Sequence, residues 1–367
     1  MLRPAAPVTL EELADDPHPL LARLRESEPV AWVPALQGWL VTRYDLALAV
    51  LRDADTFTVD DPRFSTARVI GPSMLSRDGA EHARHRTPFL APFRPAAVRD
   101  HFAPFIAATA ADLIAAFPPD EVELRSAFAG PLAVAVVVDA LGLPGVDAAT
   151  VRSWYAAMVD SVSAVTAGAD PTPEGATAYR DLHEAVSRGL HFQTHTLTEA
   201  EVVANAAVLM FGGIDTTEGM ITNLVRHLLL HPAPVTSAAV EESVRLEPAA
   251  AVVDRYATRD TALAGVPVPA GDLVVVSLAG ANRDPAVFPD PDTFDPHRPN
   301  ASMNLSFARG PHFCIGARLA RVETEIAART LFETFPNLRL APDHPHTPHG
   351  LVFRKPTALH VRTTMPT

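Results

Sequence analysis

The single cysteine of this 367-residue chain, Cys314, lies in the segment FARGPHFCIG, residues 307–316. A helix is expected directly after it, from Ala317 to Phe335. A thiolate at the start of a helix is stabilised by free N–H groups and by the positive end of the helix dipole. Gly310 and Gly316 would let the backbone approach a large flat ligand closely. Most lone cysteines are buried core thiols, but the flanking glycine, phenylalanine and histidine residues favour a ligand-binding role here.

A second candidate for chemistry is the segment FGGIDTT, residues 211–217, inside a long helical pattern. A glycine in a helix interior costs about 1 kcal/mol relative to alanine, so Gly212 and Gly213 should meet some requirement. One such requirement would be close packing against a neighbouring helix. The polar pair Asp215 and Thr216 favours another, a widening or kink where a hydroxyl group or water interrupts the helical hydrogen bonds.

A third candidate is the acid–base pair Glu242 and Arg245 in the segment AVEESVRL, residues 239–246. Three residues apart, the two side chains would share one face of a helix and could pair. Taken alone, such a pair is usually solvated and contributes little to stability.

Together, these three segments resemble the cytochrome P450 family, and the resemblance extends in the family's order over residues 15–363. Residues 307–316 are similar to its haem-binding signature, although Ala308 stands where a glycine is usual. Residues 211–217 resemble its oxygen-activation motif, and residues 239–246 its Glu-x-x-Arg helix. The fold that this implies is mainly α with a small β region (α+β).

The resemblance implies a haem b cofactor whose iron is ligated by the thiolate of Cys314, which would favour cleavage of the O–O bond of O2. It places Phe307, Gly212 and Gly316 beside the haem. It also implies that Thr216 stabilises oxygen bound at the iron and that Asp215 relays protons from solvent.

Further residues match the family's contacts to the two haem carboxylates, which need cationic or N–H donors when buried. These are His82, Arg86, Arg255 and His312. The resemblance also adds Arg298 to Glu242 and Arg245. In this network two bidentate arginines would hold a buried glutamate and fix the loop that leads to Cys314.

The residues expected to line the substrate pocket are almost all apolar, which favours an apolar or aromatic small molecule. They are Ile70, Leu209, Gly213, Val252, Val253, Leu351 and Val352. Electrons would come from a separate ferredoxin and ferredoxin reductase. Arg309, Arg318 and Arg321 would form the basic surface on which an acidic ferredoxin docks.

The elements that must position these residues follow from periodicity and turn signals. Helices are expected over Asp45–Asp53, Leu197–Leu230 and Ser237–Leu246, the second opened by a capping box from Thr198 to Glu201. Short strands are expected at 252–253, 263–268 and 273–278, after a largely helical first part of the chain. One large domain over residues 1–367 is the expected organisation. The segment 164–176, rich in alanine, glycine and proline, predicts a mobile lid within residues 160–195.

Composition excludes several classes of protein. Hydrophobic residues make up 48% of the chain and charged residues 20%, as in ordinary globular proteins. A net charge of -13 argues against binding to a nucleic-acid backbone. The most apolar run, residues 127–146, is interrupted by two prolines and an aspartate, so no membrane span is expected. We expect a cytoplasmic monomer.

The function expected from the resemblance is insertion of one oxygen atom from O2 into a small molecule, in bacterial secondary metabolism. Three alternatives stay open: another reaction on the same fold, such as oxidative coupling or desaturation; a haem-binding sensor or electron carrier without turnover; and a cysteine hydrolase using Cys314 and His312. The last lacks a third group to orient the histidine.

Overall fold

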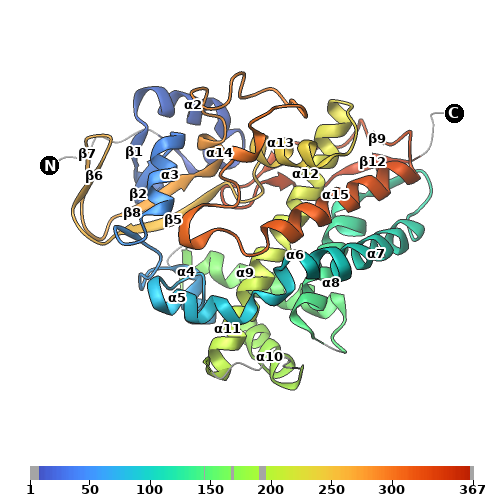
Figure 1. Ribbon diagram of the computed structural model, residues 1–367, viewed down its shortest axis with the longest axis horizontal. Coiled ribbons are helices and arrows are strands. Elements are labelled where there is room, and N and C mark those ends of the chain that lie inside the picture. Colours follow the sequence, from blue (N-terminus) through green and yellow to red (C-terminus); the bar gives the residue numbers. More distant parts are fainter. Residues whose placement is uncertain (1–7, 144, 167–168, 190–195, 364–367) are drawn as a thin grey trace.

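The computed structural model describes residues 8–143, 145–166, 169–189 and 196–363. Helices dominate, and the strands form small sheets at the edges of the helical body (Figure 1). The α-helices are α1 (Leu10–Ala14), α2 (Pro17–Ser27), α3 (Tyr44–Arg52), α4 (Ser65–Ile70), α5 (Gly79–Arg86), α6 (Pro95–Ala97), α7 (Ala103–Ala115), α8 (Gly130–Leu141), α9 (Ala148–Thr166), α10 (Pro173–Gly189), α11 (Glu199–Gly213), α12 (Asp215–Leu230), α13 (Ser237–Leu246), α14 (Leu278–Ala281) and α15 (Ala317–Thr334).

The largest sheet has the strand order β1-β2-β8-β5-β3, in which only β2 and β8 are parallel neighbours. A second sheet has the order β4-β12-β9, and β6–β7 and β10–β11 are hairpin-like pairs. The strands are β1 (Val30–Val33), β2 (Gly38–Val41), β3 (Phe57–Thr58), β4 (Glu121–Glu123), β5 (Val252–Ala257), β6 (Thr261–Leu263), β7 (Val266–Val268), β8 (Leu273–Ser277), β9 (Arg339–Leu340), β10 (Pro348–His349), β11 (Lys355–Pro356) and β12 (His360–Arg362).

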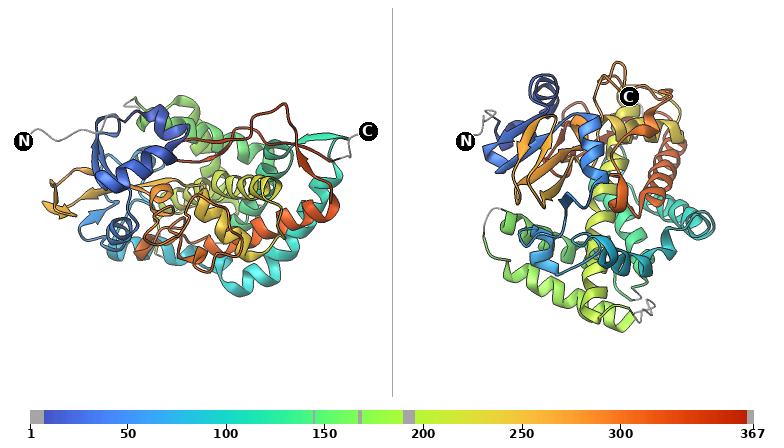
Figure 2. Two further views of the ribbon diagram at one scale, coloured as in Figure 1. Left: turned by 90° about the horizontal axis from the view of Figure 1, so that it is seen from above. Right: turned by 60° about the vertical axis from the view of Figure 1, so that its left-hand side comes forward.

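Helices α11 and α12 run through the middle of the molecule (Figures 1 and 2). Figure 2 shows the largest sheet on one side of α12 and the helices α7 and α15 on the other. Apolar residues of α12 pack with those of α7, α8, α13 and α15 in one cluster, and α11 packs with α8, α9 and α10 in another. The central helices are therefore held on all sides and can position polar groups within an apolar core.

The single helix expected from Leu197 to Leu230 is two helices. Helix α11 begins at the expected capping box, where Thr198 accepts a hydrogen bond from the Glu201 N–H and the Glu201 side chain accepts one from the Thr198 N–H. It ends at Gly213, and α12 begins at Asp215. Ile214 between them has a ψ of -73°, steeper than in a regular helix. The kink expected from the adjacent glycines is thus a break at one residue, because the Ile214 N–H still donates to the Met210 carbonyl and the Glu218 N–H to the Ile214 carbonyl.

Two sequence-based expectations about the strands need correction. Residues 263–268, expected as one strand, are divided by a turn: Leu263 ends β6, Ala264 and Gly265 have positive φ, and Val266–Val268 form β7. The N-terminal part of the chain, expected to be helical, contributes β1 and β2 to the largest sheet. These strands are only four residues long, too short for a clear alternation of apolar and polar residues.

The expected lid region is more helical than its composition indicates. Helix α9 extends to Thr166 and α10 begins at Pro173. A Cβ added to Gly175 would lie 2.4 Å from the Cβ of Ser161, so the two helices are closely packed there. Residues 167–168 and 190–195, on which the rest of the lid prediction falls, lie outside the described residues.

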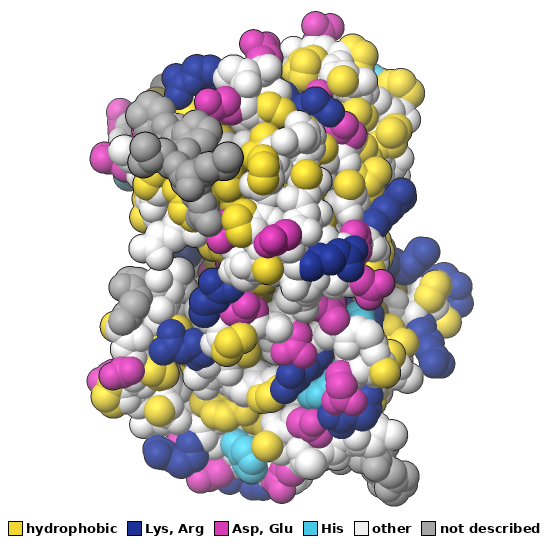
Figure 3. Space-filling model, turned by 90° about the vertical axis from the view of Figure 1, so that its left-hand side faces the viewer, with side chains coloured by type: hydrophobic (Ala, Val, Ile, Leu, Met, Phe, Trp, Pro, Cys, Tyr) yellow, Lys and Arg dark blue, Asp and Glu magenta, His cyan; other side chains and the backbone are white. Residues whose placement is uncertain are grey.

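The surface at the left of Figure 1 carries acidic and basic side chains in a mixed pattern (Figure 3). Within the described part of the chain, no helix is both long and apolar enough to cross a membrane.

Candidate active site

The loop before α15 holds Cys314 in a fixed position. The Cys314 N–H donates to the carbonyl of Phe307 across 2.9 Å, which closes the loop. Ala308 has a φ of 56°, in the left-handed region that glycine adopts without strain. Gly310 also has positive φ, and a Cβ there would lie 2.5 Å from the carbonyl oxygen of Leu51. Gly310 is thus required both by its backbone conformation and by the close approach of α3.

The sulfur of Cys314 lies at the start of α15 and faces a cavity. Burial raises the pKa of the Cys314 thiol, while the N–H groups of Gly316 and Ala317 and the positive charges of Arg86 and Arg321 oppose that rise. These groups favour a thiolate, as expected for a helix N-terminus. A metal ion bound to the sulfur would deprotonate it outright.

Four cationic or N–H side chains converge beside this loop from α5, β5 and the loop itself. His82 is buried, its ring lies 4.4 Å from that of His312, and its Nε2 has no hydrogen-bond partner. Burial and the neighbouring His312 lower the pKa of His82 to about 4, so its ring is neutral. His312 Nε2 lies 2.7 Å from Asp78, whose pKa the hydrogen bonds from His312, Thr58 and Val59 lower to about 2 against the effect of burial.

The two arginines of this group have no carboxylate partner among the described residues. Arg255 is 5% exposed and donates only to the carbonyl of Asp254, and burial lowers its pKa to about 10. Arg86 is half-buried and donates to the carbonyl of Phe313. Buried guanidinium groups are normally paired with anions, so this set indicates an anionic ligand that carries its own carboxylates.

One large cavity lies between the cysteine loop and the central helices. The cavity volume is about 270 Å³. Its wall includes Arg86, His312, Cys314 and Thr216. The rest is mostly apolar, with Met74, Val136, Val137, Leu141, Leu209, Met220 and Val253 among its residues. The cysteine and the polar groups thus border a space suited to an apolar ligand.

The wall of this cavity differs in part from the expected substrate pocket. Leu209, Gly213 and Val253 line it as expected, whereas four expected residues do not: Ile70, Val252, Leu351 and Val352. Ile70, the last residue of α4, is buried in the core. Val252 and Leu351 pack against the N-terminal cluster of α1 and α2. Val352 is 47% exposed. Side chains alternate between the two faces of a strand, so Val253 faces the cavity and Val252 faces away.

Gly212, Gly213 and Thr216 lie at the interruption between α11 and α12. A Cβ on Gly213 would lie 2.5 Å from the side chain of Val137 in α8, so Gly213 is required for close helix packing. A Cβ on Gly212 would meet nothing within 4 Å, because Gly212 faces the cavity. The Thr216 hydroxyl donates to the carbonyl of Gly212. Close helix packing therefore accounts for Gly213, whereas a Cβ at position 212 would meet no steric conflict among the described residues.

Comparisons with known proteins agree with this geometry. The family model described as Cytochrome P450 matches residues 233–360. The monooxygenase PikC of Streptomyces venezuelae is 34% identical over 90% of this chain and 86% of its own. The chain belongs to the cytochrome P450 family. Mycinamicin IV hydroxylase/epoxidase of Micromonospora griseorubida is 33% identical over 92% of this chain and 93% of its own. The crystal structure of P450BioI in complex with a fatty-acid-ligated acyl carrier protein superposes with a TM-score of 0.84, at 29% identity, over 95% of this chain and 99% of that one.

The family consists of haem-thiolate oxidoreductases. Its membership of this family identifies this P450 as a monooxygenase. The described residues fit a haem: a cysteine at a helix N-terminus that lines the cavity, an unpartnered Nε2 on His82, and two arginines without carboxylate partners, of which Arg255 is buried and Arg86 half-buried. Phe307 and Gly316 line the cavity beside Cys314, as the resemblance implies.

Asp215 lies in a charged network that sequence reasoning missed. Its Oδ1 is 2.7 Å from Nζ of Lys355, the single lysine of the chain, which comes from β11. The same Nζ is 2.7 Å from Oε1 of Glu218, one turn further along α12, and Glu218 also pairs with Arg125. Lys355 is 7% exposed. The chain's one lysine was a signal available in the sequence, but nothing in the sequence places β11 beside α12.

Tyr155 of α9 is a second buried polar group near Asp215. Burial and the charge of Asp215 raise the pKa of its hydroxyl far above the usual range, and the hydroxyl oxygen has no hydrogen-bond partner within the usual geometric limits. Its ring packs edge-to-face on Phe211. The neutral Tyr155 hydroxyl is thus a polar group near Asp215, on the side of the network where the surrounding side chains are apolar.

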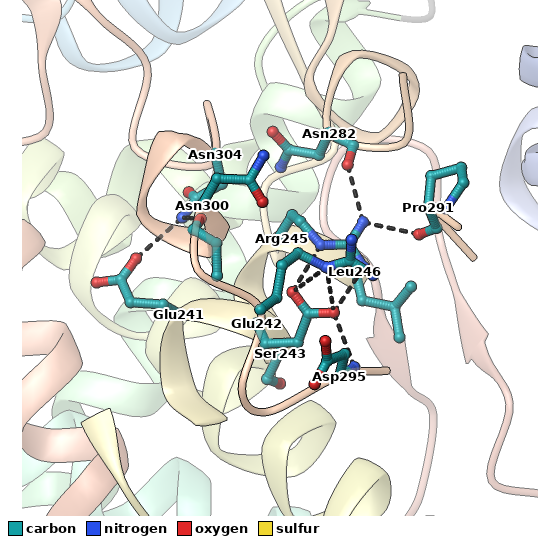
Figure 4. Close-up of polar contacts among 12 residues, drawn as sticks. Glu241, Glu242, Ser243, Arg245, Leu246, Asn282, Pro291, Asp295, Asn300 and Asn304 are labelled. Atoms are coloured by element: carbon teal, nitrogen blue, oxygen red, sulfur yellow. Dashed lines mark hydrogen bonds and ion pairs between the residues drawn. The ribbon is translucent and has the colours of Figure 1, made fainter. Parts of the chain in front are cut away.

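The structure brings Glu242, Arg245 and Arg298 together in the buried network that the resemblance implies. Figure 4 shows Glu242 and Arg245 in this network. Arg245 is bidentate, with Nε and Nη2 2.7 and 2.8 Å from the two oxygens of Glu242. Arg298 is not bidentate: its Nε alone reaches both oxygens, at 3.0 and 3.1 Å. Its other nitrogens donate to the carbonyls of Pro289, Asp290 and Thr293. The two arginines therefore fix the meander of residues 289–295 by its carbonyl groups.

The three arginines expected to bind a redox partner differ in their surroundings. Arg321 pairs with Glu241 and lies 4.1 Å from the ring of Phe307, so its charge is largely compensated. Arg309 donates to the carbonyl of Asn304 and is half-buried. Arg318 is exposed and has no ion pair within the described ranges. Arg318 is thus the best placed of the three to present positive charge to solvent.

Proposed function

We propose that this P450 inserts one oxygen atom from O2 into an apolar or aromatic small molecule of bacterial secondary metabolism, with electrons from a separate ferredoxin and ferredoxin reductase. One observation carries the proposal: Cys314 and Thr216 line the same predominantly apolar cavity. A thiolate ligand, a proton-donating hydroxyl group and an apolar binding space are the components that such a reaction requires.

Haem would be held by Cys314 at the iron, and by His82, Arg86, Arg255 and His312 at its two carboxylates. For His312 to donate to a carboxylate, its bond to Asp78 must be shared or exchanged. When bound, thiolate-ligated haem supplies the binding and reductive cleavage of O2. The electron-donating thiolate is protected from solvent by Phe307 and Phe93, which line the same wall.

Proton delivery to the cavity falls to Thr216 and Asp215. The Thr216 hydroxyl now donates its proton to the Gly212 carbonyl and can rotate about χ1 to donate into the cavity instead. Next to Thr216 in the chain, the Asp215 carboxylate pairs with the Lys355 ammonium, which also pairs with the Glu218 carboxylate. Arg125 at the far end of this series is 36% exposed, so the series reaches solvent, and Thr216, adjacent to it in sequence, lines the cavity.

The apolar wall positions the substrate and excludes water. Val136, Val137 and Leu141 of α8, Leu209 of α11 and Val253 of β5 leave few polar groups to bind a hydrophilic ligand. A substrate is therefore held by apolar burial and shape. Two similar proteins support a largely apolar substrate for this chain too: one is a mycinamicin IV hydroxylase/epoxidase, and the other was crystallised with a carrier-bound fatty acid.

Spectroscopy and isotope labelling test the proposal together. The reduced protein with carbon monoxide should show the red-shifted Soret band of a thiolate-ligated haem, and Cys314→Ala should abolish it. Turnover under 18O2, with ferredoxin, reductase and a substrate found by its spectral shift, should give product that contains one 18O atom. Turnover without 18O in the product would refute the insertion reaction and indicate coupling or desaturation.

Thr216 has a matched control in its neighbour Thr217, which lines the same cavity. Thr216→Ala should keep the carbon monoxide band and substrate binding, yet release more peroxide per electron consumed, because a proton donor is lost. Thr217→Ala should leave that ratio near the wild-type value. Equal ratios in the two variants would assign proton delivery to another group.

A further inference from the structure

A cluster of two histidines and one glutamate lies on the β4-β12-β9 sheet, outside the haem cavity. Glu121 begins β4, His360 begins β12, and His344 lies in the turn after β9. His344 Nε2 is 3.1 Å and His360 Nδ1 is 3.3 Å from the same oxygen, Oε1 of Glu121. It is the one group of three or more histidine, cysteine, aspartate or glutamate residues in the described chain whose ligand atoms all lie within 4.8 Å.

The spacing of these atoms suits a tetrahedral ion. Zinc binds imidazole nitrogen and carboxylate oxygen at about 2.0–2.2 Å, so adjacent ligand atoms around it are about 3.3 Å apart. The two measured N···O separations of 3.1 and 3.3 Å are close to that value. A ligand set of two imidazoles and one carboxylate also favours zinc over magnesium or calcium.

The carboxylate of Glu121 is oriented for this role. Arg362 Nε lies 3.3 Å from Oε2, the oxygen that does not contact the histidines. The arginine thus holds one carboxylate oxygen and leaves the other directed at both imidazoles, as groups outside the ligand shell commonly do at metal sites.

The two imidazole rings are stacked, with centroids 3.8 Å apart and planes 10° from parallel. Each ring must turn for its nitrogen lone pair to point at one shared ion. His344 can do so, since it lies in a turn and its side chain is 40% exposed. Asp343, next to it, also contacts Arg362 and adds negative charge beside the cluster.

We propose that Glu121, His344 and His360 bind a zinc ion, with water completing the coordination. Glu121 lies more than 200 positions before His344 and His360 in the chain, so the ion would link β4 to β12 and to the turn after β9. None of them lines the cavity of Cys314. The ion is therefore structural and stabilises the sheet formed by the C-terminal strands.

The test uses the full chain with haem bound, without a histidine tag, after removal of metals by a chelator. Titration with zinc sulfate, followed by calorimetry at pH 7.5, should show one site per chain. The zinc K-edge absorption spectrum of the 1:1 sample should show two histidine ligands and an oxygen or nitrogen shell at about 2.0–2.1 Å. This signal is separate from that of the haem iron, so the result does not depend on catalytic activity.

Variants locate the ion. His344→Gln and His360→Gln should each weaken zinc binding at least about tenfold, since loss of even an outer-shell partner costs 10–100-fold. They should also abolish the rise in unfolding temperature that zinc causes in the wild type. His349→Gln is the matched control: His349 also pairs with one carboxylate, Asp15 at 2.9 Å, but within the described residues it belongs to no cluster of three possible metal ligands.

Two results would overturn the proposal. The first is wild-type protein that binds no zinc at micromolar concentrations, or that shows no histidine ligands at the zinc edge. The second is binding that His344→Gln and His360→Gln leave unchanged, which would place the ion elsewhere on the surface. Neither result would bear on the haem-dependent function, because the carbon monoxide spectrum and substrate turnover are measured separately.

Discussion

Lys355→Met tests whether the buried network at Asp215 depends on the chain's single lysine. Methionine keeps much of the volume of the lysine stem but removes its charge. The side chains of Lys355, Asp215 and Glu218 are only 9, 18 and 9% exposed, so the variant leaves buried carboxylates without their shared cation. Removing one partner of a buried ion pair typically costs about 3–5 kcal/mol.

The structure indicates a value near the lower limit, about 3 kcal/mol. Glu218 keeps Arg125 as a partner, and Asp215 has some access to water. Unfolding entropy is about 2.1 cal/mol/K per residue, or about 0.8 kcal/mol/K for a chain of this length, so the unfolding temperature should fall by about 4 °C. The same variant should release more peroxide per electron, because Asp215 loses the group that orients it.

The assays are thermal unfolding of the haem-bound protein at a fixed scan rate and peroxide release during turnover. Lys355→Arg, which keeps the positive charge, should restore part of both properties. The double variant Lys355→Met with Asp215→Asn should be less destabilised than the sum of the single variants, because no unpaired charge then remains at position 215. Strict additivity, or a loss below about 1 kcal/mol for Lys355→Met, would refute the reasoning.

Three further predictions concern other parts of the chain. Ala308→Gly should raise stability by about 0.5–1 kcal/mol in urea unfolding, because alanine at a φ of 56° is strained, whereas Gly310→Ala should destabilise strongly, because its Cβ would lie 2.5 Å from the Leu51 carbonyl oxygen. Equal effects of the two would contradict the conformational argument. The pKa of Glu201 is lowered to about 2, first by Arg84 and also by the capping box, so its stabilising contribution is complete above its ordinary pKa of 4.5 and is lost as the pH falls toward 2. The stability difference between wild type and Glu201→Gln should therefore shrink from pH 7 to pH 3, and a constant difference would show that the charge is unimportant. Arg318→Glu should slow reduction by an acidic ferredoxin severalfold at low salt, with the difference vanishing at high salt, and stopped-flow trapping with carbon monoxide measures this. An unchanged rate would place the docking surface elsewhere.

The sequence by itself determined the parts of the site that consist of neighbouring residues. The segment around Cys314, the capping box of α11 and the pair Glu242 and Arg245 depend on spacings of a few residues, and the helix geometry that relates them is the same in any protein. The unusual Ala308 was also visible in the sequence. Its cost was not, because only the structure shows that this position has positive φ.

The tertiary structure alone decided which distant residues meet. Lys355 reaches Asp215 across 140 positions, and Arg321, expected on an exposed basic surface, is paired with Glu241 across 80. The pocket wall shows the same limit: Val253 lines the cavity, while Val252 and Leu351 pack against the N-terminal helices. An apolar residue is stabilised by burial in either place, since the hydrophobic effect has no direction, so only the packing of the elements chooses between a core and a cavity wall.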